Sequence, residues 1–511
     1  MKKIFTLSLT IVFTLTINAQ VPSIEWQKSF GGSSYDLAWS VIQTTDGGYV
    51  VAGYSFSNNG DVTGHHGNND YWIVKLSNTG AIQWQKSLGG SNTEEAWSII
   101  QTTDGGYAIA GGSASSDGNV TGHLNARDYW VVKLNSTGTI QWQKILGGSG
   151  NDIAASIIQT IDGGYAIAGR SVSNDVDVSG NHGVDDFWVV KLNSIGTIEW
   201  QKSLGGSSFD LAYSIIQTID SGYVVAGSSQ SNDGDVSGNH GSDDYWIVKL
   251  SNAGIIEWQK SFGGSGTDMA YSIVQTTDGG YAVAGLTGSN DGNVTGNHVV
   301  GEYWVIKLTI TGTIEWQKCL GGNGSDYASS IIQTSDGGYA IAGRSESDDG
   351  DVTGNHGSGD YWIVKLNNTG NLEWQKSLGD SSYDQANSII QTIDGGYMVV
   401  GYSESNDGDV SGNHGDKDYW VVKLSASTGI EETENNNDFN VYPNPATNQL
   451  IIEIRGIEVE EINIYNTTGT LVSQPKQLQN KSIDISLFPK GIYVAEIKTK
   501  KESLKRRWIK M

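Results

Sequence analysis

Acidic side chains recur in one polar segment that the chain repeats along most of its length. In the copy S-N-D-G-D-V-S-G-N-H-G, which starts at Ser231, Asp233 and Asp235 are separated by a single residue. Carboxylate oxygens are the ligands that Ca²⁺ prefers. The copies therefore provide one set of calcium candidates: Asp233, Asp235, Asp291, Asp349, Asp351, Asp407 and Asp409.

The same segment also suits ordinary turns. N-D-G-D-V-S-G-N matches an EF-hand loop only in part, and no glutamate closes it. All eight histidines lie in these segments, but neutral imidazole suits zinc or copper better than calcium. In turns, Asp and Asn side chains commonly form hydrogen bonds with the nearby backbone, and Gly permits the turn conformation. We favour turns, keep calcium as the alternative, and expect no other cofactor.

The pattern offers no catalytic constellation. An active site needs unlike groups in different roles, so it should break a repeat in a few places. We find no nucleophile motif, no unique histidine beside a unique acid, and no Gly-rich phosphate loop. The basic departures Arg127, Arg170, Arg344 and Lys417 are scattered along the chain. We therefore expect that the protein is not an enzyme.

Two tryptophan series define the repeat. The first lies in a W-Q-K frame and the second in Y/F-W-[VI]-[VI]-K-L, each with a spacing of 58 residues. Seven units follow one another without insertion or deletion, from Trp26 to Trp374 and from Trp72 to Trp420. Such regularity indicates identical modules in one symmetric arrangement.

Each unit is predicted to contain four short strands. In one unit these are residues 212–218, 223–228, 245–250 and 255–261, with Gly-containing turns between the first and last pairs. No run has the 3.6-residue period of an amphipathic helix. None of the five prolines lies inside the repeats, which fits strands that are all paired.

The two ends of the repeat region are complementary. It begins with a lone fourth strand, residues 24–29, and ends after a lone third strand, residues 419–424. In a closed ring these two strands can pair, whereas an open stack leaves both as free edges. The sequence therefore predicts an all-β fold. Residues 20–426 would form a seven-bladed β-propeller whose N-terminal strand closes the last blade; the alternative is a β-solenoid.

The pair of strands from Tyr71 to Trp84, Y-W-I-V-K-L-S-N-T-G-A-I-Q-W, resembles the strand–turn–strand of quinoprotein-type propellers. The whole repeat, about residues 23–425, is similar to propeller arrays in secreted proteins of Bacteroidetes. The resemblance implies that the tryptophan after the T-G turn packs between neighbouring blades. It implies little about function, because propellers host many unrelated activities.

The N-terminus has the features of a signal peptide. Lys2 and Lys3 precede an apolar run from Ile4 to Ile17, and Ala19 is the small residue before the expected cut. Residues 1–19 are therefore the expected signal peptide, and because their apolar run is too short to span a bilayer as a helix, we expect no transmembrane segment. The only cysteine, Cys319, cannot form an internal disulfide, so the fold must depend on its core.

The C-terminal region differs in composition. A polar linker, residues 427–437, precedes Y-P-N-P at 442–445, I-N-I-Y-N-T-T-G at 462–469, L-F-P-K-G-I-Y at 487–493 and a basic finish at 505–510. Residues 438–511 thereby resemble the C-terminal sorting domain (type A) of type IX secretion cargo; the alternative is an ordinary small β-domain. The resemblance implies an Ig-like β-sandwich that the type IX secretion machinery recognises. It also implies export through the periplasm of a Gram-negative bacterium to the cell surface or the medium. The strands expected in this region are residues 449–454, 461–465, 483–487 and 491–498.

Charge also separates the two regions. The repeats carry 18 basic and 45 acidic residues, whereas the chain from Glu431 carries 11 of each. A body of this charge repels nucleic acid and anionic membranes, and we expect neither as a partner.

Variable positions concentrate on one expected face of the ring. The turns within the first and last strand pairs are nearly invariant, while the residues around the start of the first strand differ from unit to unit. Loops on a rigid scaffold commonly carry binding sites. We expect a binding or interaction module for a glycan or protein ligand; the alternatives are an enzyme acting on polysaccharide and a purely structural surface protein. The aromatic candidates on this face, which suit sugar stacking or packing against the next blade, are Tyr35, Trp39, Trp97, Phe209, Tyr213, Tyr271 and Tyr383.

An acidic residue also precedes each first strand: Asp36, Glu94, Asp152, Asp210, Asp268, Asp326 and Asp384. These acids either surround the mouth of a channel or cap their own turns, and we favour capping.

Overall fold

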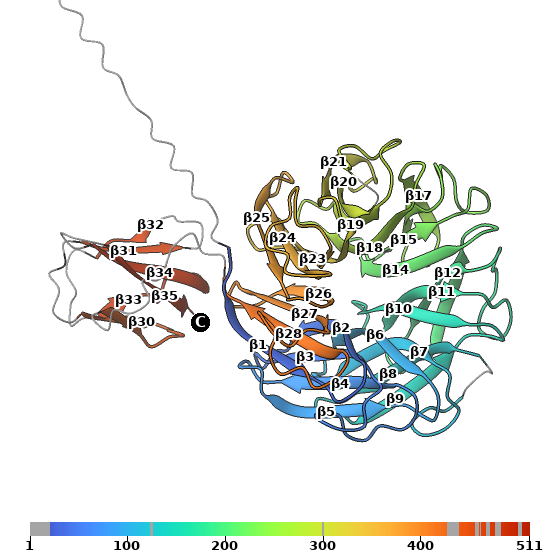
Figure 1. The fold of residues 1–511 in the computed structure, drawn as a ribbon, viewed down its shortest axis with the longest axis horizontal. Coiled ribbons are helices and arrows are strands. Elements are labelled where there is room, and N and C mark those ends of the chain that lie inside the picture. The colour runs from blue at the N-terminus through green and yellow to red at the C-terminus, as the bar shows by residue number, and fades with distance from the viewer. Residues whose placement is uncertain are drawn as a thin grey trace, which may run out of the picture. The chain divides into compact units, whose positions relative to one another are not determined.

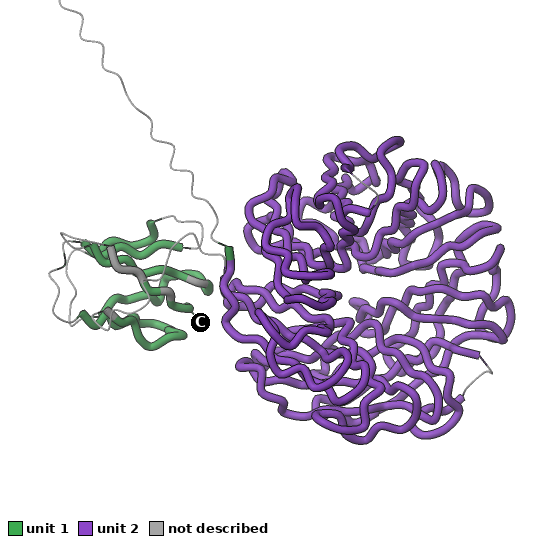
Figure 2. Tube along the Cα trace, in the orientation of Figure 1, with its two compact units in different colours: residues 1–21, 427–511 green, residues 22–426 purple. Residues whose placement is uncertain are grey.

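The computed structural model describes residues 21–122, 126–298, 301–426, 439–454, 459, 461–466, 471–475, 482–498 and 503–510. The chain divides into two compact units, residues 22–426 and the remainder (Figure 2). The expected signal peptide and the linker lie outside the described residues.

The larger unit consists of seven antiparallel four-stranded sheets, here called blades. Blade 1 comprises β2 (Asp36–Gln43), β3 (Tyr49–Ser55), β4 (Asp70–Leu76) and β5 (Ile82–Leu88). Blade 2 comprises β6 (Glu94–Gln101), β7 (Tyr107–Ser113), β8 (Asp128–Leu134) and β9 (Ile140–Leu146). Blade 3 comprises β10 (Asp152–Gln159), β11 (Tyr165–Ser171), β12 (Asp186–Leu192) and β13 (Ile198–Leu204). Blade 4 comprises β14 (Asp210–Gln217), β15 (Tyr223–Ser229), β16 (Asp244–Leu250) and β17 (Ile256–Phe262).

The remaining blades repeat this order. Blade 5 comprises β18 (Asp268–Gln275), β19 (Tyr281–Thr287), β20 (Glu302–Leu308) and β21 (Ile314–Leu320). Blade 6 comprises β22 (Asp326–Gln333), β23 (Tyr339–Ser345), β24 (Asp360–Leu366) and β25 (Leu372–Leu378). Blade 7 comprises β26 (Asp384–Gln391), β27 (Tyr397–Ser403), β28 (Asp418–Leu424) and β1 (Ile24–Phe30). The four strands of a blade, in sheet order, are called a, b, c and d below.

The sheets form a ring with the a strands innermost (Figure 1). The ring closes as the sequence predicts, because β1 pairs antiparallel with β28 from Ile24↔Leu424 to Phe30↔Tyr419. The fold is therefore a seven-bladed β-propeller, and the solenoid alternative is wrong. Because a closed ring has no end blades, it leaves no open edge to cap.

Aromatic side chains join each blade to the next. Trp72 is fully buried in strand c and its ring centroid lies 4.5 Å from that of Tyr419 in the preceding blade. The hydroxyl of Tyr419 donates to the backbone oxygen of Trp72 at 2.8 Å. The strand d tryptophan, Trp26, packs against Tyr49 of the next blade with centroids 6.2 Å apart. The inter-blade role expected of this tryptophan is confirmed.

Polar contacts explain why the polar residues of the repeat motif recur in every blade. The indole nitrogen of Trp72 donates to the side-chain oxygen of Gln85 in the W-Q-K frame at 2.9 Å. The buried Lys75 ammonium group lies 3.0 Å from Asp46 in the a–b turn. Since a buried charge without a partner is costly, this lysine and its aspartate must be retained together.

The described part of the C-terminal unit is a two-sheet sandwich. One sheet orders β29 (Phe439–Tyr442), β30 (Gln449–Ile454) and β33 (Ser482–Asp484). The other orders β32 (Leu471–Ser473), β31 (Glu461–Asn466), β34 (Gly491–Lys498) and β35 (Ser503–Lys510). Both sheets bury apolar residues in one core that includes Leu450, Ile464 and Trp508. This unit therefore has its own core.

Candidate functional site

The fourth residue of every a strand, and the second residue of this strand in blades 6 and 7, line a cavity at the ring axis. Residues from all seven blades line one cavity of about 380 Å³ near the start of these strands. Its size lies at the lower end of the range for small-molecule sites. The lining residues are Trp39, Trp97, Ala155, Tyr213, Tyr271, Tyr327, Ser329, Gln385 and Asn387. We call this cavity the axial pocket.

The aromatic side chains of the axial pocket contact one another. Trp39 and Trp97 have ring centroids 4.3 Å apart, and Tyr213 and Tyr271 have centroids 5.1 Å apart. Tyr327 continues the row, 6.5 Å from Tyr271. The pocket thus presents apolar ring surface along most of its wall and polar groups at Ser329, Gln385 and Asn387.

The other three aromatic candidates do not line this pocket. Tyr35 and Phe209 are 45% and 41% exposed, and Tyr383 stacks on Tyr402 with centroids 6.1 Å apart. These residues precede strand a, where isolated bridges such as Asp185↔Phe209 join them to the preceding blade. They lie on the rim, so the structure brings only four of the seven candidates together.

Sequence reasoning missed a polar hub in the axial pocket. The side-chain oxygen of Gln385 accepts hydrogen bonds from Tyr327 at 2.8 Å, Tyr402 at 3.0 Å and Tyr383 at 3.1 Å. Its amide nitrogen donates to Asn387 at 2.9 Å. The sequence contained a signal for this hub. Tyr327 and Gln385 are the second residues of their a strands, and this position varies among the blades, with only leucine occurring twice.

The four basic departures are not scattered in space. Arg170 and Arg344 hold the same position of strand b, and Arg127 and Lys417 the same position before strand c. Both positions lie at the end of the blade that carries the b–c and d–a loops. The interpretation of these residues as scattered is wrong, because equivalent positions in different blades meet around one axis.

Two of these cations belong to an aromatic and ionic network. The Arg344 guanidinium lies 4.6 Å from the ring centroid of Tyr327 and pairs with Glu346 at 2.9 Å. The Lys417 ammonium lies 4.6 Å from the ring centroid of Tyr402 and pairs with Glu404 at 2.9 Å. Each positive charge is balanced by its own carboxylate.

The calcium candidates tie the long b–c loop to the d–a loop. Asp233 accepts a hydrogen bond from the backbone of Ser207 at 2.8 Å, and Asp291 accepts one from Ser265 at 2.7 Å. Among the described residues, no group of three or more His, Cys, Asp or Glu side chains is arranged to hold a metal ion. Calcium binding by these acids stays a prediction.

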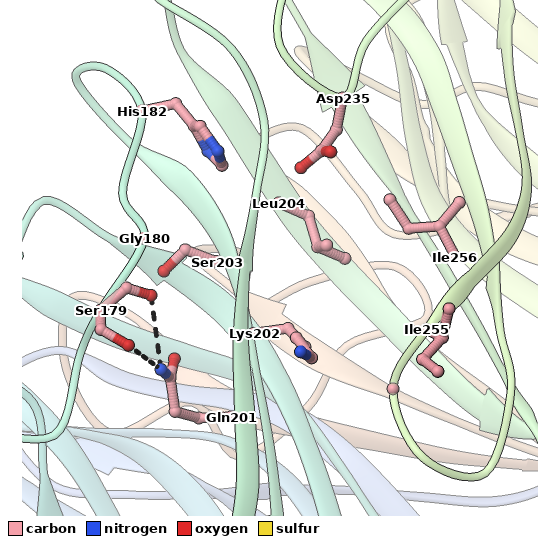
Figure 3. A pocket seen from close by; sticks show the side chains of 11 residues that line it. Ser179, Gly180, His182, Gln201, Lys202, Ser203, Leu204, Asp235, Ile255 and Ile256 are labelled. Atoms are coloured by element: carbon pink, nitrogen blue, oxygen red, sulfur yellow. Dashed lines mark hydrogen bonds between the residues drawn. The ribbon is translucent and has the colours of Figure 1, made fainter.

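A groove of about 480 Å³ between blades 3 and 4 contains one calcium candidate, Asp235 (Figure 3). His182 and Lys202 line the same groove. The His182 ring nitrogen Nδ1 lies 2.8 Å from Asp186, so a structural carboxylate already holds this imidazole.

The acids that precede strand a are caps, as we favoured. Asp36 is fully buried and its carboxylate accepts hydrogen bonds from Gly32 N at 2.7 Å and Ser57 Oγ at 2.8 Å. Burial raises the pKa of Asp36 to about 6; hydrogen bonds from Ser55, Gly32 and Ser57 oppose the rise, and the nearby Asp418 adds to it. Burial likewise raises the pKa of Asp210 to about 6, and it raises the pKa of Asp360, at the start of strand c in blade 6, to the same value.

These acids predict a propeller that is more stable at pH 5 than at pH 7.5. Between pH 3.8 and about 6 the folded chain retains protons that the unfolded chain releases. Their stabilisation is therefore full below pH 3.8 and lost as the pH rises through about 6. The whole shift corresponds to about 3 kcal/mol per group, and roughly half of it is lost between pH 5 and pH 7.5. We expect a melting temperature several degrees higher at pH 5, measured by calorimetry.

Asp36→Asn should remove part of this pH dependence, because the amide carries no proton to release. Asp117→Asn is the matched control, since Asp117 is fully exposed and hydrogen bonds from Ser91 lower its pKa. A melting temperature that rises from pH 5 to pH 7.5 would contradict the prediction.

Residues 440–511 match the secretion system C-terminal sorting domain. The chain is similar to Sqt1 from Chaetomium thermophilum at 11% identity and a TM-score of 0.40, covering 80% of this chain and all of that one. It is also similar to BamB from Moraxella catarrhalis, at 13% identity and a TM-score of 0.36, covering 79% and 100%. A third similar structure is the Pan2 WD40 domain of Neurospora crassa, at 8% identity and a TM-score of 0.43, covering 78% and 95%. No curated protein sequence matches the chain.

The protein is a β-propeller with a C-terminal sorting domain of the type IX secretion system. This domain marks it for export to the cell surface or the medium. Within the described ranges, no helix is long and apolar enough to cross a membrane.

Proposed function

We propose that the exported protein is a binding module that holds a sugar residue in the axial pocket. The observation that carries the proposal is the lining of this pocket: aromatic rings from five blades surround a space closed on the remaining side by Ser329, Gln385 and Asn387. A sugar ring has apolar C–H faces and a polar hydroxyl edge. Ring surface suits the first, and the amide and hydroxyl groups suit the second.

A binding role accounts for how the repeat varies. Residues that hold the blades together, such as Trp72 and Lys75, recur in every unit, whereas the pocket position reads Trp, Trp, Ala, Tyr, Tyr, Ser, Asn around the ring. Seven equal blades would make a symmetric hole. Five kinds of side chain in an irregular order make a site with one orientation for its ligand.

A panel of immobilised oligosaccharides, incubated with the full-length exported protein, tests the proposal. Tyr271→Ser is a suitable variant because Ser329 occupies the equivalent position in blade 6. We expect the affinity for the retained glycan to fall about 30-fold, the loss typical of a buried aromatic anchor. Phe209→Thr, on the rim, is the matched control and should bind normally, since blades 2 and 5 carry threonine there.

Failure to retain any glycan, or equal affinity in Tyr271→Ser and the parent protein, would refute the proposal. Cleavage of a retained glycan would show instead that the pocket belongs to an enzyme acting on polysaccharide.

A further inference from the structure

Beside the axial pocket, blade 3 opens a second cavity of about 230 Å³. It shares Trp97, Ala155 and Tyr213 with the axial pocket. The cavity exists because blade 3 carries an alanine where blades 2 and 4 carry Trp97 and Tyr213. Two guanidinium groups, from Arg127 and Arg170, also line it. We call this cavity the side pocket.

Arg127 reaches the side pocket over a glycine. A Cβ atom at Gly112 would lie 2.7 Å from Arg127 Nε, so any other residue there would displace the arginine or be displaced. Blade 2 is the only blade with glycine at this strand b position. Gly112 therefore leaves room for the Arg127 side chain. At the position of Arg127, only blade 7 has another basic residue, Lys417.

The guanidinium groups of the side pocket are incompletely satisfied. One terminal nitrogen of Arg127 pairs with Glu95, but its Nε is buried and has no hydrogen-bond partner. No carboxylate among the described residues lies within 4 Å of Arg170, although Asp185 is close enough to interact electrostatically. Burial raises the pKa of Asp185, and Arg170 opposes the rise.

Arg170 distinguishes the side pocket from the opposite side of the axis, because Arg127, like Arg344, has one carboxylate partner and a buried Nε without a hydrogen-bond partner. There Arg344 and Lys417 each have a carboxylate partner within 2.9 Å and lie against aromatic rings. Two arginines with unused donors are also unusual in repeats that carry 18 basic and 45 acidic residues. A buried donor without a partner is costly, so an oxyanion that accepts from it gains affinity.

We propose that the side pocket binds the carboxylate of an acidic sugar whose ring occupies the axial pocket; this rests on the proposed function. Arg127 and Arg170 donate to the carboxylate oxygens, for which the planar guanidinium is well suited. A hexuronate carries its carboxylate directly on the sugar ring. A sugar ring that packs against Trp97 and Tyr213 in the axial pocket can therefore direct its carboxylate into the side pocket. The ligand class is therefore a uronate-containing polysaccharide.

Calorimetric titration of the full-length exported protein with three oligosaccharides tests this assignment. The three share one backbone and end in glucuronate, in glucose or in glucose 6-sulfate. We expect the glucuronate-ended chain to bind about tenfold to a hundredfold more tightly than the neutral one, as charge-assisted hydrogen bonds predict. The preference should shrink at high salt.

The repeat supplies matched variants. Arg170→Ser and Arg127→Asn copy Ser228 of blade 4 and Asn69 of blade 1, and each should abolish the preference for glucuronate. Arg344→Ser removes the same charge from the same strand position on the other side of the axis. It should leave the preference intact.

Each other outcome refutes the assignment in a distinguishable way. Equal loss in all three variants would mean a general effect of charge, and tighter binding of the sulfate ester would mean a different oxyanion. Equal binding of neutral and acidic chains would overturn the side-pocket proposal and leave the sugar site intact. No binding of any chain would overturn both.

Discussion

Deleting residues 438–511 should abolish delivery to the cell surface and the medium, while the propeller accumulates, folded, in the periplasm. The match to the sorting domain covers residues 440–511, so the deletion removes the whole sorting domain and leaves the expected signal peptide in place. The propeller does not need this region for its core, because the buried hydrophobic residues described in this unit lie between Phe30 and Leu424. Fractionation with immunoblotting measures where the protein is, and calorimetry measures whether it is folded.

A pocket variant provides the control for export. Tyr271→Ser keeps the C-terminal unit intact and should reach the cell surface or the medium in normal amounts. Trp508→Ala, which truncates a fully buried side chain of the C-terminal core, should reproduce the deletion in part. If the truncated chain appeared at the cell surface or in the medium, the sorting signal would lie outside residues 438–511.

The propeller was predictable from the sequence because its determinants are periodic. Two tryptophan series at one spacing define the blades, and the strand expected at residues 223–228 differs from β15 by one residue. In the C-terminal unit, residues 449–454 and 491–498 are strands as expected. A periodic pattern identifies such elements because every repeat must satisfy the same packing.

Elements without such a pattern were harder to predict. The strand expected at residues 483–487 ends at Asp484, whose carboxylate accepts a hydrogen bond from Ser486 N at 2.9 Å and turns the chain. The last strand, β35, was missed as a strand because S-L-K-R-R-W-I-K lacks clear alternation. Its conformation depends on pairing with β34 along its whole length.

The site was predictable by position but not by composition. Trp39, Trp97, Tyr213 and Tyr271 were recognised because large rings stand out in a variable column of the repeat. The hub at Gln385 and the gap at Ala155 were not, since a small or amide side chain has no distinctive chemistry alone. Their roles follow from the neighbours that the ring places beside them.

Removing residues 20–30 should strongly destabilise the propeller, because β1 is the fourth strand of blade 7. The deletion exposes the edge of β28 and removes Phe30, which is 6% exposed. It also removes Gln27, which accepts from the Trp420 indole at 3.0 Å, and Glu25, which lies 3.2 Å from the buried Lys423. Loss of a large core side chain alone costs about 3–5 kcal/mol, a large share of a typical stability of about 5–15 kcal/mol.

The measurement is the melting temperature of chains produced without the signal peptide, so that processing plays no part. We expect a fall of at least about 5 °C for the chain that begins at Gly31, given about 2–4 °C per kcal/mol in domains of 150–250 residues. A chain that begins at Val21 retains β1 and serves as the control.

A synthetic peptide of residues 22–30 should restore much of the loss, because an exposed strand edge can accept an added strand. An unchanged melting temperature in the shorter chain would mean that pairing of β1 with β28 contributes nothing to closure. Rescue by the peptide would show that the stability resides in that one contact between the two ends of the ring.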